Sequence, residues 1–354
     1  MADPNDASAE FEERLLRAAA EETPLDIVGG GSKSFLGRLT QSEAFDVSAH
    51  RGVVAYEPTE LVITARAGTP LGEIEALLAD SGQMLAFEPP HFGATATLGG
   101  TVASALSGPR RPYAGAARDF VLGARILNGE GQMLNFGGQV MKNVAGYDVS
   151  RLMVGAMGTL GVLLEVSLKV LPLAARTTTR VFSLDAATAI ERMNALAAKP
   201  TPLSGACFEA GRLYLRLSGT AGGVAQAAET LGGDAMDDES HWHGLREQSL
   251  PYFDTPLPLW RLSVPPATPP LHIAGETLMD WGGALRWLKS EVPGEEVRAA
   301  VSKVGGHATR YRNGDRRGAI YHPLSPALLS LHQRLKASFD PKGILNRGRM
   351  YADL

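Results

Sequence analysis

Glycines gather in three short stretches of this chain, and their spacing suggests chemistry. The stretches are residues 29–34 (Gly-Gly-Gly-Ser-Lys-Ser), 97–104 (Thr-Leu-Gly-Gly-Thr-Val-Ala-Ser) and 155–161 (Gly-Ala-Met-Gly-Thr-Leu-Gly). Glycine loses more backbone freedom on folding than any other residue, so its clusters mark places where the backbone turns sharply or approaches a ligand. Small neighbours leave backbone amides uncovered, and clustered amides bind anions such as a pyrophosphate. A turn-rich β domain is the alternative, and composition alone does not decide between the two.

Two known phosphate-binding motifs do not fit the first stretch. A dinucleotide fingerprint requires glycine at its sixth position, where Ser34 stands. A Walker loop requires Gly-Lys followed by Ser or Thr, whereas Ser32 precedes Lys33. The stretch is therefore either a glycine nest that follows a strand, with Lys33 adding positive charge, or a plain turn.

The composition limits the classes of protein. A chain of 354 residues with 44% apolar and 20% charged residues suits an ordinary soluble protein of two domains. The net charge of −4 and the lack of a dense Lys/Arg block argue against nucleic acid as a partner. A single cysteine excludes an internal disulfide and an iron–sulfur cluster held by this chain. The prolines and glycines of the uncharged segment 89–109 argue against a membrane span.

Periodicity and capping residues predict the elements that position these stretches. The predicted helices cover 7–22, 70–82 with Thr69 as its cap, Asp185 to Ala198, and 223–231. The predicted strands cover 25–28, 61–67 and 213–217, and a β-rich segment covers 162–170. A last helix is predicted to begin at Ser325 and to carry Leu328, Leu331, Leu335 and Phe339 on one face.

Several motifs together resemble the FAD-binding domain of the vanillyl-alcohol-oxidase (PCMH-type) flavoproteins. They are Pro89-Pro90, the second glycine stretch, Arg118-Asp119 and the third glycine stretch. Residues 142–148 (Lys-Asn-Val-Ala-Gly-Tyr-Asp) and 339–351 (Phe-Asp-Pro-Lys-Gly-Ile-Leu-Asn-Arg-Gly-Arg-Met-Tyr) narrow the match. They are similar to the smaller FAD-binding subunit of bacterial glycolate oxidases.

The resemblance implies an α+β fold, with a PCMH-type FAD-binding domain of two subdomains and a smaller α+β cap domain. We expect the FAD-binding domain over residues 1–173 and the cap over 174–300. Residues 301–354 would form a C-terminal segment that returns to the FAD-binding domain.

The resemblance also implies which residues bind FAD. It assigns one arm of a pyrophosphate cradle to the first glycine stretch, the other arm and the floor under the flavin ring to the second, and the adenosine side to the third. The expected cofactor-binding residues are Gly29, Gly30, Gly31, Ser32, Lys33, Ser34, Thr97, Leu98, Gly99, Gly100, Ala103, Ser104, Gly158, Thr159, Gly161, Val162 and Asn346. Many relatives bond FAD covalently through a histidine in the first glycine loop. This loop has no histidine, so we expect non-covalent FAD.

His307 and Arg310 are the candidates for catalysis. By resemblance, His307 lies where larger relatives carry a histidine-bearing loop over the flavin ring. A 2-hydroxy acid requires a guanidinium for its carboxylate and an imidazole as the base for its hydroxyl. The larger relatives also carry a metal-bound histidine cluster in the cap, and this sequence shows none, so no metal site is expected.

The resemblance implies an FAD-binding subunit of a glycolate oxidase, which oxidises glycolate to glyoxylate. Electrons would pass through the flavin to an iron–sulfur subunit, with a second flavin subunit as a further partner. The expected location is the cytoplasm, peripheral to the inner membrane through these partners. Two alternatives stay open: a structural subunit with a degenerate flavin site, and a stand-alone FAD-linked 2-hydroxy-acid dehydrogenase.

Overall fold

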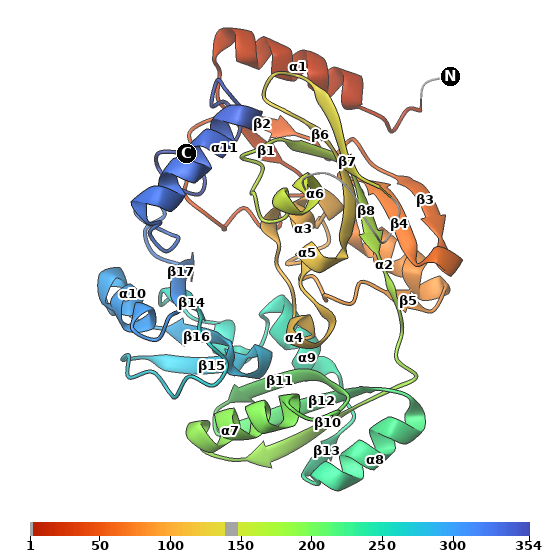
Figure 1. Ribbon diagram of the computed structural model, residues 1–354, viewed down its shortest axis with the longest axis vertical. Coiled ribbons are helices and arrows are strands. Elements are labelled where there is room, and N and C mark those ends of the chain that lie inside the picture. Colours follow the sequence, from red (N-terminus) through yellow and green to blue (C-terminus); the bar gives the residue numbers. More distant parts are fainter. Residues whose placement is uncertain (1–2, 139–147) are drawn as a thin grey trace.

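The structure, a computed structural model, describes residues 3–138 and 148–354. Two units lie one below the other along the long axis of the molecule (Figure 1). The first holds a five-stranded sheet and two small sheets, and the second holds an eight-stranded sheet. The α+β fold predicted from the sequence is confirmed. Of the segment 142–148, residues 142–147 lie outside the described residues.

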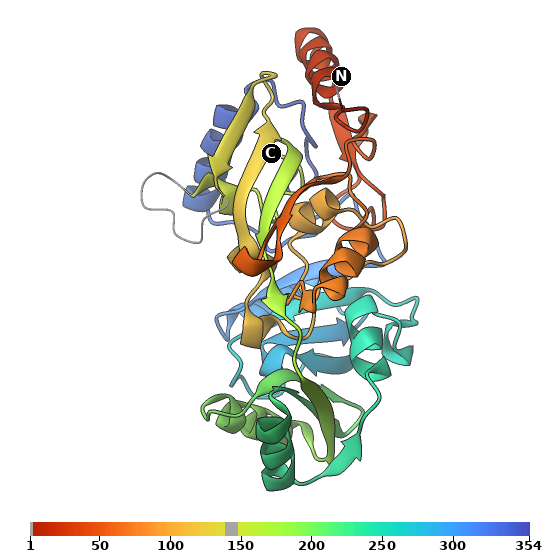
Figure 2. The ribbon, with the colours of Figure 1, turned by 90° about the vertical axis from the view of Figure 1, so that its right-hand side faces the viewer.

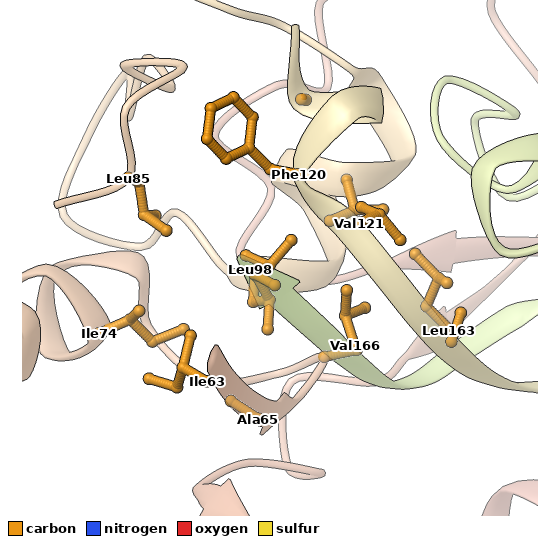
Figure 3. Close-up of a cluster of buried hydrophobic side chains, with 14 of the residues drawn as sticks. Ile63, Ala65, Ile74, Leu85, Leu98, Phe120, Val121, Leu163 and Val166 are labelled. Carbon is orange, nitrogen blue, oxygen red and sulfur yellow. The ribbon is translucent and has the colours of Figure 1, made fainter. Parts of the chain in front are cut away.

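The five-stranded sheet of the first unit has the order β3-β4-β8-β6-β7, and its neighbouring strands are antiparallel. Its strands are β3 (Val53–Glu57), β4 (Val62–Arg66), β6 (Val121–Leu127), β7 (Met133–Gly137) and β8 (Val162–Lys169). Helices α2 (Leu71–Asp80) and α3 (Leu98–Ser104) pack on this sheet. Ile74 and Leu98 from the helices meet Ile63 and Val166 from the strands in one buried cluster (Figure 3). This packing fixes the second glycine stretch, which forms α3, against the sheet.

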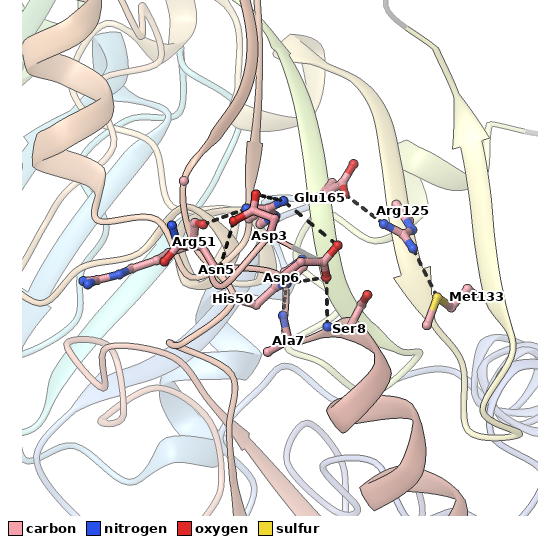
Figure 4. Close-up of polar contacts among 12 residues, drawn as sticks. Asp3, Asn5, Asp6, Ala7, Ser8, His50, Arg51, Arg125, Met133 and Glu165 are labelled. Atoms are coloured by element: carbon pink, nitrogen blue, oxygen red, sulfur yellow. Dashed lines mark hydrogen bonds and ion pairs between the residues drawn. The ribbon is translucent and has the colours of Figure 1, made fainter. Parts of the chain in front are cut away.

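A small parallel sheet lies beside it, formed by β1 (Leu25–Val28) and β2 (Glu43–Asp46). Helix α1 (Ser8–Glu21) buries Phe11 and Leu15 against this pair. Just before α1, the Ala7 amide donates to Nδ1 of His50 (3.1 Å), as Figure 4 shows. The start of the chain is thereby tied to the loop that follows β2.

The remaining elements of the first unit are short. They are β5 (Gln83–Met84), which pairs with β9 (Leu171–Pro172), and the helices α4 (Arg111–Ala114), α5 (Ala117–Phe120) and α6 (Val149–Leu152).

The eight-stranded sheet of the second unit has the order β13-β10-β12-β11-β15-β16-β14-β17 and is antiparallel throughout. Its strands are β10 (Arg176–Ser183), β11 (Leu203–Glu209), β12 (Arg212–Gly219), β13 (Asp234–Met236), β14 (Leu259–Ser263), β15 (Glu276–Asp280), β16 (Leu285–Lys289) and β17 (His307–Arg312). The helices of this unit are α7 (Ala186–Ala197), α8 (Ala221–Leu231), α9 (Ser240–Glu247) and α10 (Gly294–Ser302). Helices α7 and α8 bury their apolar faces against β11 and β12.

The expected boundary at residue 300 falls inside α10, and β17 is still part of the second sheet. Strand β17 pairs with β14 from His307 opposite Ser263 to Arg312 opposite Leu259. The chain therefore returns to the first unit after Arg312 and not at residue 301. An edge strand is defined by a neighbour that is distant in the sequence, so local patterns do not reveal where it belongs.

Helix α11 (Pro326–Phe339) lies beside β6 and β7 (Figure 2). Leu335 and Phe339 pack on the core of the first unit, with the Phe339 ring 6.5 Å from that of Phe136. Leu328 and Leu331 are 48% and 51% exposed. The apolar face predicted for this helix is thus covered over its second half only.

Candidate functional site

All three glycine stretches line one large cavity in the first unit. Its empty space, open mouth included, is about 1050 Å³. Three walls come from the loop after β1, from α3 and from the loop after α6. The fourth comes from the C-terminal tail through Asn346 and Arg349.

The loop after β1 provides free hydrogen-bond donors. The backbone amides of residues 29–33 donate to no group in the described part of the chain, and these residues line the cavity. Gly30 packs so tightly that an added Cβ would lie 1.4 Å from the Thr95 carbonyl oxygen. Gly31 has φ +69° and nothing within 4 Å of an added Cβ. A run of free amides that one close contact holds in place is the geometry of an anion-binding nest.

The start of α3 forms a wall and not a set of donors. Thr97 caps the helix, and its Oγ1 accepts from the Gly100 amide (3.2 Å). The Gly99 amide donates to the Ala67 carbonyl (2.7 Å), and the Leu98 amide is bonded to the loop before α2. An added Cβ at Gly99 would lie 2.7 Å from the Cβ of Ala67, whereas one at Gly100 meets only Thr97 Oγ1, at 3.2 Å. Gly99 therefore serves packing, and Gly100 keeps the cavity open.

Asn346 joins the tail to two other walls. Its Oδ1 accepts from the Ile27 amide (2.6 Å) in β1, and its Nδ2 donates to the Met157 carbonyl (2.5 Å). Gly158 has φ +72°, and an added Cβ there would lie 2.7 Å from Nδ2 of Asn346. Arg349 donates to the Ser34 carbonyl (3.2 Å). The tail thereby holds the first and third glycine stretches at a fixed spacing.

Lys33 is a buried cation at the edge of the cavity. The residue is only 9% exposed, and this burial lowers its pKa to about 8, although Glu247 acts in the opposite direction. Its Nζ donates to the His91 carbonyl (3.3 Å) and lies 5.7 Å from the centroid of the Phe92 ring. A bound anion would offset the cost of burying this charge.

Three of the expected cofactor residues do not line the cavity. Leu98 is buried among the residues of the sheet core. Thr159 turns its hydroxyl to the Ala156 carbonyl (2.7 Å). Val162 begins β8 opposite Leu127, with its side chain in a second core cluster. The remaining expected residues all line the cavity: Gly29, Gly30, Gly31, Ser32, Lys33, Ser34, Thr97, Gly99, Gly100, Ala103, Ser104, Gly158, Gly161 and Asn346.

The two expected catalytic residues do not line the cavity either. His307 is exposed at the edge of the second sheet, with its ring centroid 6.5 Å from that of His322. Arg310 donates to the Asp315 carbonyl and lies over Trp260, with its Cζ 6.0 Å from the ring centroid. The structure places both on β17, a strand that the sequence did not predict, and its pairing in the second sheet decides where their side chains point.

Sequence reasoning missed several residues that line the cavity. They are Asp26, Ile27, Val28, Leu36, Val47, Ala67, Met153, Ala156, Met157, Leu163 and Arg349. Arg349 could have been found, because it lies in the tail motif that carries Asn346. The apolar residues give no local signal that separates a cavity wall from an ordinary core.

The cavity fits FAD. A run of free amides and the cation of Lys33 suit a pyrophosphate, and the cavity extends along all three glycine stretches. Apolar side chains such as Leu36 and Met157 line the rest of its wall and suit a flat ring. The site is therefore that of a flavin- or dinucleotide-binding protein with a two-unit α+β fold.

Comparisons with known proteins agree with this class. A family model described as "FAD binding domain" matches residues 7–137, and one described as "FAD linked oxidases, C-terminal domain" matches residues 315–350. The solved structure of p-cresol methylhydroxylase with substrate bound superposes over 98% of this chain and 87% of its own, with a TM-score of 0.72 and 15% identity. This likeness concerns the fold.

Sequence relatives narrow the class. Glycolate oxidase subunit GlcE of Escherichia coli (strain K12) is 51% identical over 354 residues, which is 99% of both chains. D-lactate dehydrogenase of Archaeoglobus fulgidus is 31% identical over 161 residues, 45% of this chain and 36% of that enzyme. The chain belongs to the family of glycolate oxidase GlcE subunits, a family of FAD-linked proteins, and the resemblance predicted from the motifs is confirmed.

Two further searches bear on metals and membranes. Among residues 3–138 and 148–354, no group of three or more His, Cys, Asp or Glu side chains could hold a metal ion. Within the same residues, no helix is long and apolar enough to cross a membrane.

Proposed function

We propose that this chain is the FAD-carrying smaller subunit of a glycolate oxidase, and that the large cavity holds the FAD without a covalent bond. The observation that carries the proposal is the 51% identity to GlcE over 99% of both chains. The residues that line the cavity support it, because they provide an anion nest and a cavity of about 1050 Å³.

The chain's own residues would bind and orient the cofactor. The amides of residues 29–33 and the Lys33 ammonium bind the pyrophosphate, and Gly100 leaves room beside it. Asn346 keeps the walls in register by bonding to both β1 and Met157. When bound, FAD accepts a hydride equivalent from the carbon of a 2-hydroxy acid that bears the hydroxyl.

The electrons must leave through another molecule. The single cysteine, Cys207, is fully buried, and one thiolate cannot hold an iron–sulfur cluster. Glycolate oxidase subunit GlcD of Bacillus subtilis is 38% identical over 88 residues, 24% of this chain and 19% of that one. We therefore propose a complex with a second flavin subunit and an iron–sulfur subunit, in the cytoplasm and peripheral to the inner membrane through these partners.

The proposal is tested with the full chain purified alone and with its co-expressed partners. The chain alone should be yellow and contain FAD. We expect it to bleach slowly or not at all with anaerobic glycolate, and the complex to oxidise glycolate to glyoxylate. A colourless chain that takes up no added FAD would refute the cofactor assignment. Rapid full bleaching of the lone chain would refute the division of labour.

A further inference from the structure

A second, smaller cavity lies where the two units meet. Its empty space, open mouth included, is about 360 Å³, roughly a third of that of the first cavity. The first unit contributes Phe92 and the segment 106–109, and α9 contributes Gln248 beyond its end. The second sheet contributes Arg261, Asp280 and Tyr311, among others. The second cavity is thus much smaller than the first, so a ligand that it binds must be small.

The arginines near this cavity differ in how their charges are balanced. Arg110 and Arg216 both pair with the buried carboxylate of Glu88, at 3.2 and 2.8 Å. Arg261, which lines the cavity, has no carboxylate within 4.0 Å in the described part of the chain, and neither does Arg111. Both instead lie over the ring of Trp281, with their Cζ atoms 4.9 and 4.3 Å from its centroid. Two guanidinium groups without a directly paired carboxylate thus lie beside one ring, and Arg261 is the one of the two that lines the cavity.

Burial makes the positive charge of Arg261 costly. The pKa of Arg261 is lowered, with burial as the largest cause and the neighbouring charge of Arg111 among the others. Asp280 is the carboxyl group among the residues that line this cavity. Burial raises its pKa to about 7, although the charges of Arg216 and Arg261 act in the opposite direction. A buried cation is stable when an anion pairs with it. Arg261 therefore has no directly paired anion among the described residues, and an anionic ligand in the cavity would supply one.

The position of the second cavity relates it to the first. Leu36 and Met157 line the large cavity, and Trp287 and Tyr311 line the small one. All four side chains belong to one packed cluster. Side chains of one packed cluster thus contribute to the walls of both cavities.

We propose that the second cavity binds the carboxylate of a small 2-hydroxy or 2-oxo acid on the guanidinium of Arg261. The identity of the acid as glycolate or its product rests on the proposed function, whereas the need for an anion does not. A carboxylate matches the planar donors of a guanidinium. The side-chain amide of Gln248 and the hydroxyl of Tyr311 line the same cavity and can bond the second oxygen function of such an acid.

The test uses the full FAD-loaded chain and sodium oxalate, a two-carbon acid that offers no C–H bond to oxidise. Isothermal titration calorimetry measures its binding at fixed ionic strength. Arg261→Gln should weaken oxalate binding by about 10- to 100-fold, because a hydrogen bond to a charged group contributes roughly that much. Gln248→Glu, which keeps the size of the side chain, should weaken it as well by placing a carboxylate in the cavity.

The matched control is Arg298→Gln. Arg298 also lies over a tryptophan of the second sheet, Trp260, with its Cζ 5.2 Å from the ring centroid, and it lines neither cavity. Its oxalate affinity should equal that of the wild type. Wild-type protein that binds no oxalate, or Arg261→Gln and Gln248→Glu variants that bind it normally, would overturn the proposal. If Arg261→Gln does not fold, Gln248→Glu decides.

Flavin absorbance, read in the same samples, separates this proposal from the proposed function. A yellow protein whose oxalate affinity does not depend on Arg261 overturns the second cavity alone. A colourless protein overturns the cofactor assignment, and its oxalate titration still tests the second cavity.

Discussion

The glycine pair in α3 offers the sharpest test of the cofactor site, because the structure separates two residues that the sequence treats alike. An added Cβ at Gly100 meets only Thr97 Oγ1, at 3.2 Å, and this residue lines the cavity. Gly100→Ala should be neutral or stabilise the helix by up to about 1 kcal/mol. Gly100→Val places two methyl groups in the space a cofactor needs. Overpacking costs about 1–3 kcal/mol, so we expect FAD affinity to fall by roughly 10- to 100-fold.

Gly99 is the matched control within the same turn. An added Cβ there would lie 2.7 Å from the Cβ and 3.0 Å from the carbonyl oxygen of Ala67. Gly99→Ala should therefore lower the free energy of unfolding of the FAD-free protein by about 1–3 kcal/mol. Urea unfolding followed by tryptophan fluorescence measures stability, and FAD titration measures affinity. A Gly100→Val protein that binds FAD as the wild type does would refute the cavity assignment. A Gly99→Ala protein of normal stability would refute the packing argument.

Three further predictions concern the tail, the second unit and the flavin. Lys336 donates to the buried carboxylate of Asp340 (2.6 Å) and to two backbone carbonyls, so Lys336→Met should lower the free energy of unfolding, measured in urea, by about 3–5 kcal/mol. The control Lys342→Met breaks an exposed ion pair and should lower it by less than about 1 kcal/mol. Equal losses in the two variants would contradict this reasoning. Burial raises the pKa of Asp280 to about 7, so the folded state binds the proton of this carboxyl group more tightly than the unfolded state does. The stability that the protonated carboxyl group contributes is therefore lost as pH rises toward and through 7. Asp280→Asn should thus be more stable relative to wild type at pH 8 than at pH 4.5 in urea titrations, and a pH-independent difference would count against the buried carboxyl. Acid precipitation should leave all flavin in the supernatant, and flavin found on a peptide would disprove the non-covalent assignment.

Much of the architecture could be predicted from the sequence because its signals are local. The Asp185 side chain caps α7 by accepting from the Thr188 amide (3.0 Å), as the pattern of residues predicts. Thr69 shows the limit of such signals. It was predicted to cap α2, but its hydroxyl donates to the Arg66 carbonyl (2.7 Å), and the cap position is Pro70. A hydroxyl next to a helix start has several acceptors within reach, and the surrounding fold selects one of them.

The sequence by itself determined where small residues leave backbone amides uncovered, because these are properties of the three glycine stretches themselves, and the family resemblance assigned these stretches to a ligand site. Only the tertiary structure decided which residues in each stretch face the ligand. Leu98 points into the core because its helix packs on the five-stranded sheet, and Val162 does so because it belongs to a strand of that sheet. Only the structure brought Asn346 to Ile27, 319 positions away, and placed no carboxylate of the described residues within 4.0 Å of the Arg261 guanidinium. Local propensity acts over a few residues, whereas burial and charge pairing are set by partners that only the folded chain brings together.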